Sequence, residues 1–210
     1  MVTIVKIPSA MTKKELITLA ELSHKKAKEG TVFVEIGSWK GCSSAILAVQ
    51  VKDAGGHLYC VDHWKGSEGT KLLDEANKED VYEVFESNMK DLELWDYITP
   101  MKMDSIKASE EFKNGSIDFL FIDGDHRYTG FMKDLEMWIP KLKDDATLCG
   151  HDAECYFTQL EPAIGHYLEL HLNDDFTDGY HAGVIVGLYD YFHDAHSLIE
   201  DTSIWVKEVV

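Results

Sequence analysis

Hydrophobic and polar positions along the chain switch several times between the spacing of a helix and the spacing of a strand. Residues 12–30 carry apolar side chains at helical spacing, with a capping box formed by Thr12 and Glu15 and a stop signal at Gly30. Further helices are expected at 42–52, 79–92, 105–113 and 127–142. Between them, short apolar runs rich in β-branched residues predict buried strands at 31–37, 57–62, 95–104, 116–123 and 146–152.

Five alternations of strand and helix predict an α/β fold, in which a doubly wound, mostly parallel sheet carries helices on both faces. The third strand is expected to be broken by Pro100. The C-terminal part changes the rhythm, because 154–172 is expected to be helical and 181–192 and 202–210 are expected to be two strands with a short connection. A short connection requires antiparallel pairing, so the sheet is expected to end in an antiparallel strand.

No repeat, linker or low-complexity segment interrupts the chain. A single domain over residues 1–210 is expected, with residues 1–30 as a helical extension. Hydrophobic residues make up 45% and charged residues 28% of the chain, which excludes a disordered protein. The chain has 20 Lys and Arg residues against 38 Asp and Glu residues, and its net charge of −18 opposes binding to nucleic acid and to anionic membrane surfaces.

The cysteines and the N-terminal residues indicate a reducing compartment. Cys42, Cys60, Cys149 and Cys155 lie in or beside apolar stretches and include no CxxC pair, so buried, reduced thiols are expected. No apolar run approaches the roughly 18 residues that a bilayer span needs. The N-terminal residues lack the apolar core of a secretory signal, and we therefore expect a cytoplasmic protein.

Acidic residues and glycines follow the expected strands one after another. In open α/β sheets, ligands bind beyond the carboxyl ends of the strands, where these residues would lie. The strand ends carry, in chain order, Glu35, Gly37 and Gly41; Asp62; Asp104; Asp123 and Asp125; and His151 and Asp152. Each acid taken alone could serve only to cap the helix that follows it. Their recurrence at five strand ends favours a ligand site at this edge of the sheet.

The first of these turns, EIGSWKGCSS, allows a close approach of the backbone to a ligand at Gly37 and Gly41. Trp39 stands where the middle glycine of a GxGxxG motif would leave space for a pyrophosphate, which argues against NAD or FAD. Asp62, at the end of the second strand, is well placed to accept hydrogen bonds from two ribose hydroxyls. The turn and the acid together fit a nucleoside cofactor.

The segments EIGSWKGCSS, YCVDHW and IDGDHRYTGFMKDLEMWIPKLKDDATLCGHD resemble class I S-adenosylmethionine (SAM)-dependent methyltransferases. More narrowly, they resemble the small-molecule group that includes macrolide-sugar O-methyltransferases and cephalosporin-hydroxylase-like proteins. The resemblance extends over residues 12–210 and implies a Rossmann-like, seven-stranded sheet of order 3-2-1-4-5-7-6. It also implies these cofactor contacts: Glu35, Gly37, Ser38 and Gly41 around the methionine part, Asp62 at the ribose, Asp104 and Ser105 beside the adenine, and Asp123 beside the reacting methyl group.

The resemblance further implies a divalent metal, Mg²⁺ or Mn²⁺, on the acid that closes the fourth strand and on an acidic pair that closes the fifth. The matching positions are Asp123, His151 and Asp152. His151 stands where a carboxylate is usual, and Mg²⁺ prefers oxygen ligands. A histidine favours Mn²⁺, Fe²⁺ or Zn²⁺. The alternative is a site without metal, in which His151 packs against the cofactor and Asp152 caps the next helix.

Methylation of a hydroxyl group requires alignment of the acceptor and removal of its proton. His126 and Asp125 are the candidate general bases, and a metal on Asp123 and Asp152 would lower the pKa of the acceptor hydroxyl. His126 could instead be a residue at a helix entry with no chemical role. The expected acceptor is a small hydroxylated molecule, and most of its pocket is formed by the N-terminal helix and residues 153–180. An open pocket of this kind is either completed by a neighbouring subunit of a homo-oligomer or suited to a small substrate.

Two other classes of function stay open at this point. The same carboxylates could hold the catalytic metal of an oxidoreductase or a hydrolase that reuses the fold. The chain could also be a nucleoside-binding protein without catalytic activity, because a fold does not determine a function.

Overall fold

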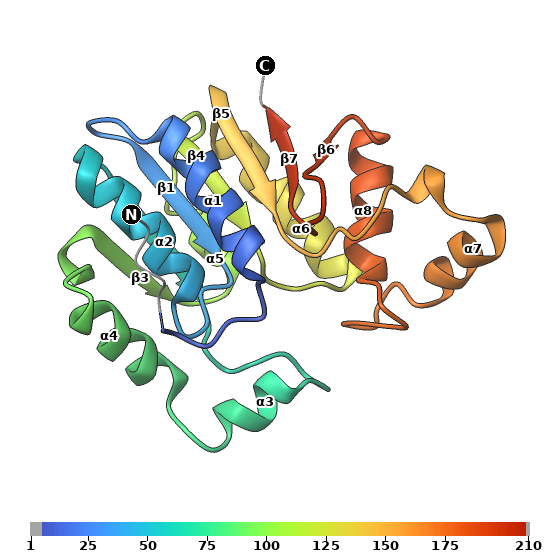
Figure 1. The fold of residues 1–210 in the computed structure, drawn as a ribbon, viewed down its shortest axis with the longest axis horizontal. Helices are drawn as coiled ribbons and strands as arrows, with labels where there is room; N and C mark the ends of the chain where they lie inside the picture. Colours follow the sequence, from blue (N-terminus) through green and yellow to red (C-terminus); the bar gives the residue numbers. More distant parts are fainter. Residues whose placement is uncertain (1–5, 209–210) are drawn as a thin grey trace.

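A mixed β-sheet runs through the middle of the molecule, and its strands lie in the order β3-β2-β1-β4-β5-β7-β6 (Figure 1). The computed structural model describes residues 6–208. The strands are β1 (Val32–Ile36), β2 (His57–Asp62), β3 (Ile98–Lys102), β4 (Ile117–Ile122), β5 (Leu142–Gly150), β6 (Ser197–Leu198) and β7 (Trp205–Glu208). The first five pair in parallel, whereas β7 is antiparallel to both β5 and β6. The expected fold class and strand order are confirmed.

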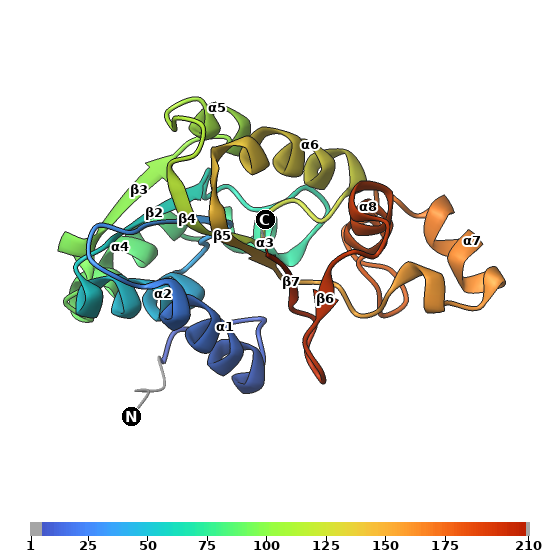
Figure 2. The same ribbon diagram turned by 90° about the horizontal axis from the view of Figure 1, so that it is seen from above.

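Helices cover both faces of the sheet (Figure 2). The helices α1 (Lys13–Lys26), α2 (Cys42–Ala54) and α4 (Val81–Asp91) pack on one face. The helices α5 (Ser105–Ser109), α6 (Tyr128–Trp138) and α8 (Ala182–Phe192) pack on the other. The short helices α3 (Lys71–Ala76) and α7 (Pro162–Leu170) lie away from the centre of the sheet (Figure 1).

The central strand β4 is buried at every position because helices cover it on both sides. Its side chains therefore alternate between two apolar layers. Phe119 stacks on Phe33 of β1 in the layer under α1 and α2, with ring centroids 4.9 Å apart. Leu120 packs into the opposite layer with Trp138 of α6. A strand covered on both faces accounts for the unbroken apolar run in the sequence.

Helix α1 begins with the expected capping box. The Glu15 amide donates to Thr12 Oγ1 at 3.3 Å, and the Thr12 amide donates to Glu15 Oε2 at 2.7 Å. These two hydrogen bonds satisfy amides that the first turn of a helix leaves free.

Strand β3 continues through Pro100 and does not break there. The strand pairs with β2 in regular parallel register, with Pro100 opposite Cys60. It lies at the edge of the sheet and has a neighbour on one side only. A proline at an edge can face outwards without removing a ladder hydrogen bond. The expected break is wrong for this reason.

The expected strand at 181–192 is also wrong, because these residues contain helix α8 and no strand. The seven residues from Ala182 to Leu188 are all buried, since α8 packs against both α6 and α7. A helix buried on every side has no polar face, so its apolar run looks like that of a buried strand. The antiparallel partner of β7 is instead β6, with Leu198 opposite Trp205.

Two expected helices are shorter in the structure. Within 154–172, only a 3₁₀ turn at Phe157–Gln159 and helix α7 are helical, and α7 begins at Pro162 because proline fits the first turn of a helix. Helix α5 ends at Ser109. Residues 1–5 and 209–210 belong to the expected domain, and 209–210 to the expected last strand, but they lie outside the described residues.

The thiols of Cys42, Cys60 and Cys149 are buried as expected, and Cys155 is half-buried. Burial raises the pKa of all four cysteines, so they are protonated at neutral pH. Among residues 6–208, no helix combines the length and the apolar character that a membrane crossing requires.

Candidate active site

The carboxyl ends of the parallel strands open onto a cavity of about 1480 Å³. This is the edge of the sheet where the sequence places the ligand site. The expected site residues that line the cavity are Gly37, Ser38, Asp62, Asp104, Ser105, Asp123, Asp125, His126, His151 and Asp152. Parts of three further segments also line the cavity, namely residues 8–11, 66–75 and 173–176.

Gly37 brings the turn after β1 into contact with the end of β4. Its φ angle is +88°, and a Cβ atom at this position would lie 1.8 Å from the carbonyl oxygen of Asp123. Only glycine allows both the left-handed conformation and this close approach. The turn and the carboxylate-bearing end of β4 therefore form one continuous wall of the cavity.

Glu35 and Gly41 lie behind this wall and do not line the cavity. The Glu35 carboxylate is fully buried, and its Oε2 accepts hydrogen bonds from Ser38 Oγ at 2.7 Å and from Ser44 Oγ. Burial raises the pKa of Glu35 to about 7, against the effect of the neighbouring hydroxyls. A Cβ atom on Gly41 would lie 2.6 Å from Met89 Cε, so this glycine makes room for α4. The structure thus gives both residues a supporting position.

Asp62 connects two turns at the cavity wall. Its Oδ2 accepts from the Trp39 amide at 2.8 Å, and its Oδ1 accepts from the Trp64 amide at 2.6 Å. The Trp64 indole in turn donates to the carbonyl of Trp39 at 2.7 Å. Burial raises the pKa of Asp62, and the two amides act in the opposite direction. The carboxylate oxygens are thereby held in a fixed orientation, with lone pairs left for a further donor.

Beside the end of β3, helix α6 contributes a buried carboxyl, Asp134, that sequence reasoning missed. Asp104 Oδ1 caps α5 by accepting from the Ile106 amide at 3.0 Å. Ser105 Oγ donates to Asp134 Oδ1 and accepts from the Trp138 indole at 2.9 Å. Asp134 lines the cavity, and burial raises its pKa to about 7. Its place on the apolar face of α6 is the signal that could have identified it.

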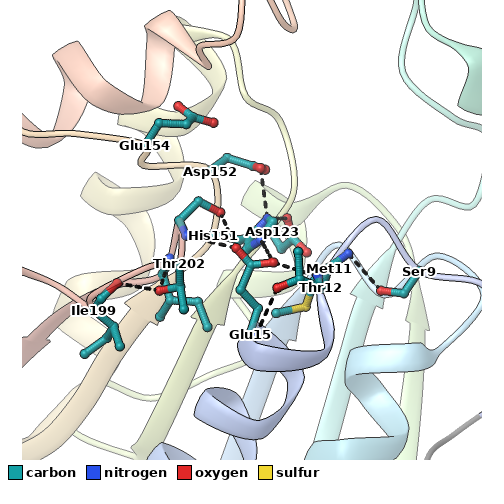
Figure 3. A network of polar contacts seen from close by, with 12 residues as sticks. Ser9, Met11, Thr12, Glu15, Asp123, His151, Asp152, Glu154, Ile199 and Thr202 are labelled. Carbon is teal, nitrogen blue, oxygen red and sulfur yellow. Dashed lines mark hydrogen bonds and ion pairs between the residues drawn. The ribbon is translucent and has the colours of Figure 1, made fainter.

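The ends of β4 and β5 gather histidines and carboxylates at the other side of the cavity. Figure 3 shows Asp123, His151 and Asp152 turned toward one another, with Glu15 of α1 beside them. We call Glu15, Asp123, His126, His151, Asp152, Glu154, Asp175 and His181 the His–Asp cluster. Sequence reasoning had placed Asp123, His126, His151 and Asp152 at the site and had missed the other four.

His151 is the most enclosed histidine of the His–Asp cluster, with 8% of its surface exposed. Its Nδ1 lies 2.9 Å from Asp152 Oδ1 and 3.8 Å from Asp123 Oδ1, and its Nε2 lies 3.3 Å from Glu15 Oε2. Burial acts to lower the pKa of His151, but Asp152, Glu15 and Asp123 raise it to about 11. The imidazole is therefore a cation when these carboxylates are its only neighbours.

His126 has a similar environment. Its Nε2 lies 2.9 Å from Asp152 Oδ2 and 3.8 Å from Asp123 Oδ1, while its Nδ1 lies 3.2 Å from Asp175 Oδ1. Burial acts to lower the pKa of His126, but the surrounding carboxylates, led by Asp152, raise it well above its usual value. In this state His126 carries a proton and cannot accept another.

Asp125, the other candidate base, is paired with Arg127. Its Oδ1 accepts from the Arg127 Nε at 2.8 Å, and its Oδ2 accepts from Nη2 at 3.1 Å. This bidentate pair holds the carboxylate at the cavity wall and neutralises its charge.

The four members of the His–Asp cluster that sequence reasoning missed come from three parts of the chain. Glu15 belongs to α1, Glu154 follows β5, and Asp175 and His181 precede α8. His181 Nδ1 lies 2.6 Å from Glu154 Oε1 and 3.4 Å from Asp152 Oδ1, and Asp175 contacts His126. Glu15 is almost fully buried although it also forms the capping box. A capping glutamate carries no sequence signal for such a contact, and no spacing relates His181 to Asp152.

Several of these buried nitrogen atoms lack a hydrogen-bond partner within the described chain. They are His126 Nδ1, His126 Nε2 and His151 Nε2. The neighbouring carboxylate oxygens are close enough, but they do not lie along the N–H directions. Nitrogen and oxygen atoms that lie side by side without bonding to each other are the arrangement of ligands around a common cation. The residues present therefore fit a metal ion.

The comparison with known families decides the class of the domain. The sequence pattern of a family described as "Methyltransferase domain" matches residues 34–153, which is more than half of the chain. The chain belongs to this methyltransferase family. The sheet order of the methyltransferase domain is that of class I, whose members depend on SAM.

Solved structures share this fold at low sequence identity. An O-methyltransferase from Bacillus cereus in complex with SAH is 18% identical, with a TM-score of 0.62 over 97% of this chain and 84% of that chain. A SAM-dependent O-methyltransferase from Thermotoga maritima is 20% identical, with a TM-score of 0.52 over 70% of this chain. The methyltransferase domain covers 47% of the Thermotoga protein. At these identities the likeness shows the fold alone.

A curated relative by sequence is the uncharacterized protein y4gI of Sinorhizobium fredii (strain NBRC 101917 / NGR234). It is 28% identical over 123 residues, which make up 58% of this chain. The matched segment spans only 13% of the length of y4gI, so the relative is a much longer protein.

Proposed function

We propose that the protein transfers the methyl group of SAM to a hydroxyl oxygen of a small acceptor molecule, with the help of a divalent cation. The observation that carries this proposal is that one cavity joins the Asp62–Ser105 side of the sheet edge to the His–Asp cluster. A nucleoside cofactor on the first side would therefore lie next to a cation on the second.

The residues at the sheet edge fit SAM. Gly41 provides no side chain to cap α2, and Cys42 and Ser43 of its first turn line the cavity. Free amides at a helix N-terminus favour a carboxylate such as that of the methionine part. Asp62 offers its remaining lone pairs to the ribose hydroxyls, and Asp134 lies beside Ser105 where the adenine is expected. When bound, SAM supplies a methyl group on a positively charged sulfur.

Asp123 stands between the two halves of the cavity. Its main chain contacts the Gly37 turn, and its side chain lies 3.8 Å from both His126 Nε2 and His151 Nδ1. We assign to Asp123 the task of orienting the acceptor hydroxyl toward the methyl group. Alignment of this kind accounts for a large part of the barrier reduction in a transfer between two bound molecules.

Asp123, His151 and Asp152 would hold the divalent cation, which when bound lowers the pKa of an acceptor hydroxyl. Their ligand atoms lie within 4.8 Å of one another. Because His151 supplies nitrogen where the resemblance implies a carboxylate, Mn²⁺ suits the site better than Mg²⁺.

The role of His126 as a general base stays a prediction. Asp152, Asp123 and Asp175 favour its charged form, so His126 has to lose its own proton before it can accept one. The pairing of Asp125 with Arg127 leaves His126 as the better candidate of the two.

The acceptor side of the cavity supports a small substrate. Residues 9–11 and 173–176 line it, and Phe176 exposes more than half of its surface beside His181. The ring centroids of Phe176 and His181 are 4.8 Å apart, and they offer an aromatic surface to an acceptor. Completion of this open side by a second copy of the chain also stays a prediction, and size-exclusion chromatography tests it.

The decisive experiment combines binding with turnover. Calorimetric titration of the chelator-treated protein with SAM and with SAH is expected to show binding of both. Incubation with isotope-labelled SAM and a panel of catechols, sugars and polyketides, with Mn²⁺ or with chelator, is then expected to give a methylated product only with the metal.

The other functional classes give different results in the same experiment. Metal binding without any nucleoside binding at millimolar concentration would contradict the proposal and favour a metal-dependent oxidoreductase or hydrolase. Binding of SAH with no methyl transfer to any acceptor would favour a nucleoside-binding protein.

A further inference from the structure

A second group of metal-binding side chains adjoins the one that the methyltransferase fold implies. It consists of His126, Asp152 and His181, whose ligand atoms lie within 4.8 Å of one another. Asp152 belongs to both groups: its Oδ1 lies near His151 and His181, and its Oδ2 lies near His126. The second group draws His181 from the start of α8 and so depends on a contact between distant parts of the chain.

We propose that His126, Asp152 and His181 form a separate cation position that binds a transition-metal dication. This position lies beside the one formed by Asp123, His151 and Asp152, and it does not depend on the proposed methyl transfer. A cation bound there would occupy His126 Nε2, so His126 would act as a general base only while the position is empty. Two imidazole nitrogens and one carboxylate are a ligand set for Mn²⁺, Fe²⁺, Co²⁺ or Zn²⁺ and a poor one for Mg²⁺.

The distances around Asp152 support this position. Its Oδ2 lies 2.9 Å from His126 Nε2, and its Oδ1 lies 3.4 Å from His181 Nδ1. The two imidazole rings meet edge to face, with their centroids 4.8 Å apart. His126 Nε2 is inaccessible to solvent and has no hydrogen-bond partner among the described residues. A buried nitrogen without a partner is costly, and a cation between it and the carboxylate would satisfy both.

One carboxylate behind His126, and another beside the His181 nitrogen that faces Asp152, hold the two rings in place. Asp175 Oδ1 lies 3.2 Å from His126 Nδ1, so the opposite nitrogen of that ring faces Asp152. Glu154 contacts His181 twice, through Oε1 at 2.6 Å from Nδ1 and through Oε2 at 3.1 Å from the main-chain amide. A carboxylate behind a ligating histidine is the usual support of a metal site in proteins. Glu154 Oε1 is also an additional oxygen ligand within reach.

The test uses the full chain after chelator treatment and metal ions alone, without SAM. Calorimetric titration with Co²⁺ is compared for the wild type, His181→Gln, Asp123→Asn and His166→Gln. His166 is an exposed histidine on α7 and provides the matched control. We expect His181→Gln to weaken Co²⁺ binding by more than about tenfold, and His166→Gln to leave it unchanged. We expect Asp123→Asn to keep a Co²⁺ site of nearly wild-type affinity, and millimolar Mg²⁺ to leave this site occupied.

A spectroscopic measurement on the wild type tests the same point without any variant. Bound Cu²⁺ or Mn²⁺ is expected to show magnetic coupling to the nitrogens of two imidazoles by pulsed electron paramagnetic resonance. Coupling to a single imidazole would overturn the proposal, because the position at Asp123 contains only His151. So would an unchanged Co²⁺ affinity in a folded His181→Gln protein, or an equal loss in Asp123→Asn. Failure of the methyltransferase assay would leave all of these results interpretable, since none of them involves SAM.

Discussion

Glu15 Oε2 lies 3.3 Å from His151 Nε2, and this ion pair joins the first turn of α1 to the end of β5 (Figure 3). Glu15 Oε1 also accepts from the amide of Ser203 at 2.9 Å, in the turn before β7. One carboxylate therefore connects the N-terminal helix, the candidate site and the C-terminal strand. Its neighbours lower the pKa of Glu15, against the effect of burial.

The His151 ion pairs make the stability of the protein pH-dependent on the alkaline side. The pKa of His151 is raised from 6.5 to about 11, so its contribution is complete below pH 6.5 and is lost as the pH rises toward 11. We expect the free energy of unfolding of the wild type, measured in urea, to fall between pH 7 and pH 10 by about 2 kcal/mol more than that of His151→Gln. Equal slopes in the two proteins would contradict this assignment, and His166→Gln serves as the control.

Asp134 gives a pH dependence of the same sign in a lower range. Its pKa is raised to about 7 by burial, so its contribution is complete below the usual value of 3.8 and is lost as the pH rises through 7. Asp134→Asn keeps an oxygen for the Ser105 hydroxyl and cannot ionise. We expect the variant to gain about 1–2 kcal/mol on the wild type between pH 5 and pH 8, as measured by urea unfolding. A constant difference across this range would show that Asp134 is ionised throughout.

A comparison of Gly37→Ala with Gly115→Ala separates the effect of steric contact on stability from the effect of backbone strain. The new methyl group would meet the Asp123 carbonyl, and we expect a loss of at least about 3 kcal/mol in the free energy of unfolding. Gly115 also has a positive φ angle, of +66°, but no atom lies within 4 Å of the place that an alanine methyl group would take. Gly115→Ala is therefore expected to cost only about 1 kcal/mol. Similar losses in both variants would mean that the turn can move away from β4.

Asp62→Asn tests the cofactor side of the site. The amide group would replace one of the oxygens that accept from Trp39 and Trp64, and would remove the charge that we propose to face the ribose hydroxyls. We expect SAH affinity to fall by more than about tenfold in calorimetry. Asp53 on α2 lies outside the cavity wall and provides the control, since Asp53→Asn should bind SAH like the wild type. Wild-type affinity in Asp62→Asn would remove this residue from the cofactor site.

The sequence by itself determined the parallel part of the sheet and the place of the candidate site. Strand β4 and helix α1 carry local signals, an unbroken apolar run and a capping box, and local signals depend on neighbours in the chain. Asp62, Asp123 and His151 could be assigned to one edge because parallel strands all end on the same side of a sheet.

Only the tertiary structure decided which residues surround that edge. The first seven residues of helix α8 are all buried, so this part of its sequence lacks the polar face that would distinguish a helix from a strand. Asp134 and His181 reach the cavity, and Glu15 reaches His151, because α1, α6 and α8 pack as they do. Such packing joins residues that no spacing along the chain relates. The contacts that orient the histidines, and the separation of Glu35 from the cavity by a layer of serines, are likewise properties of the packed molecule.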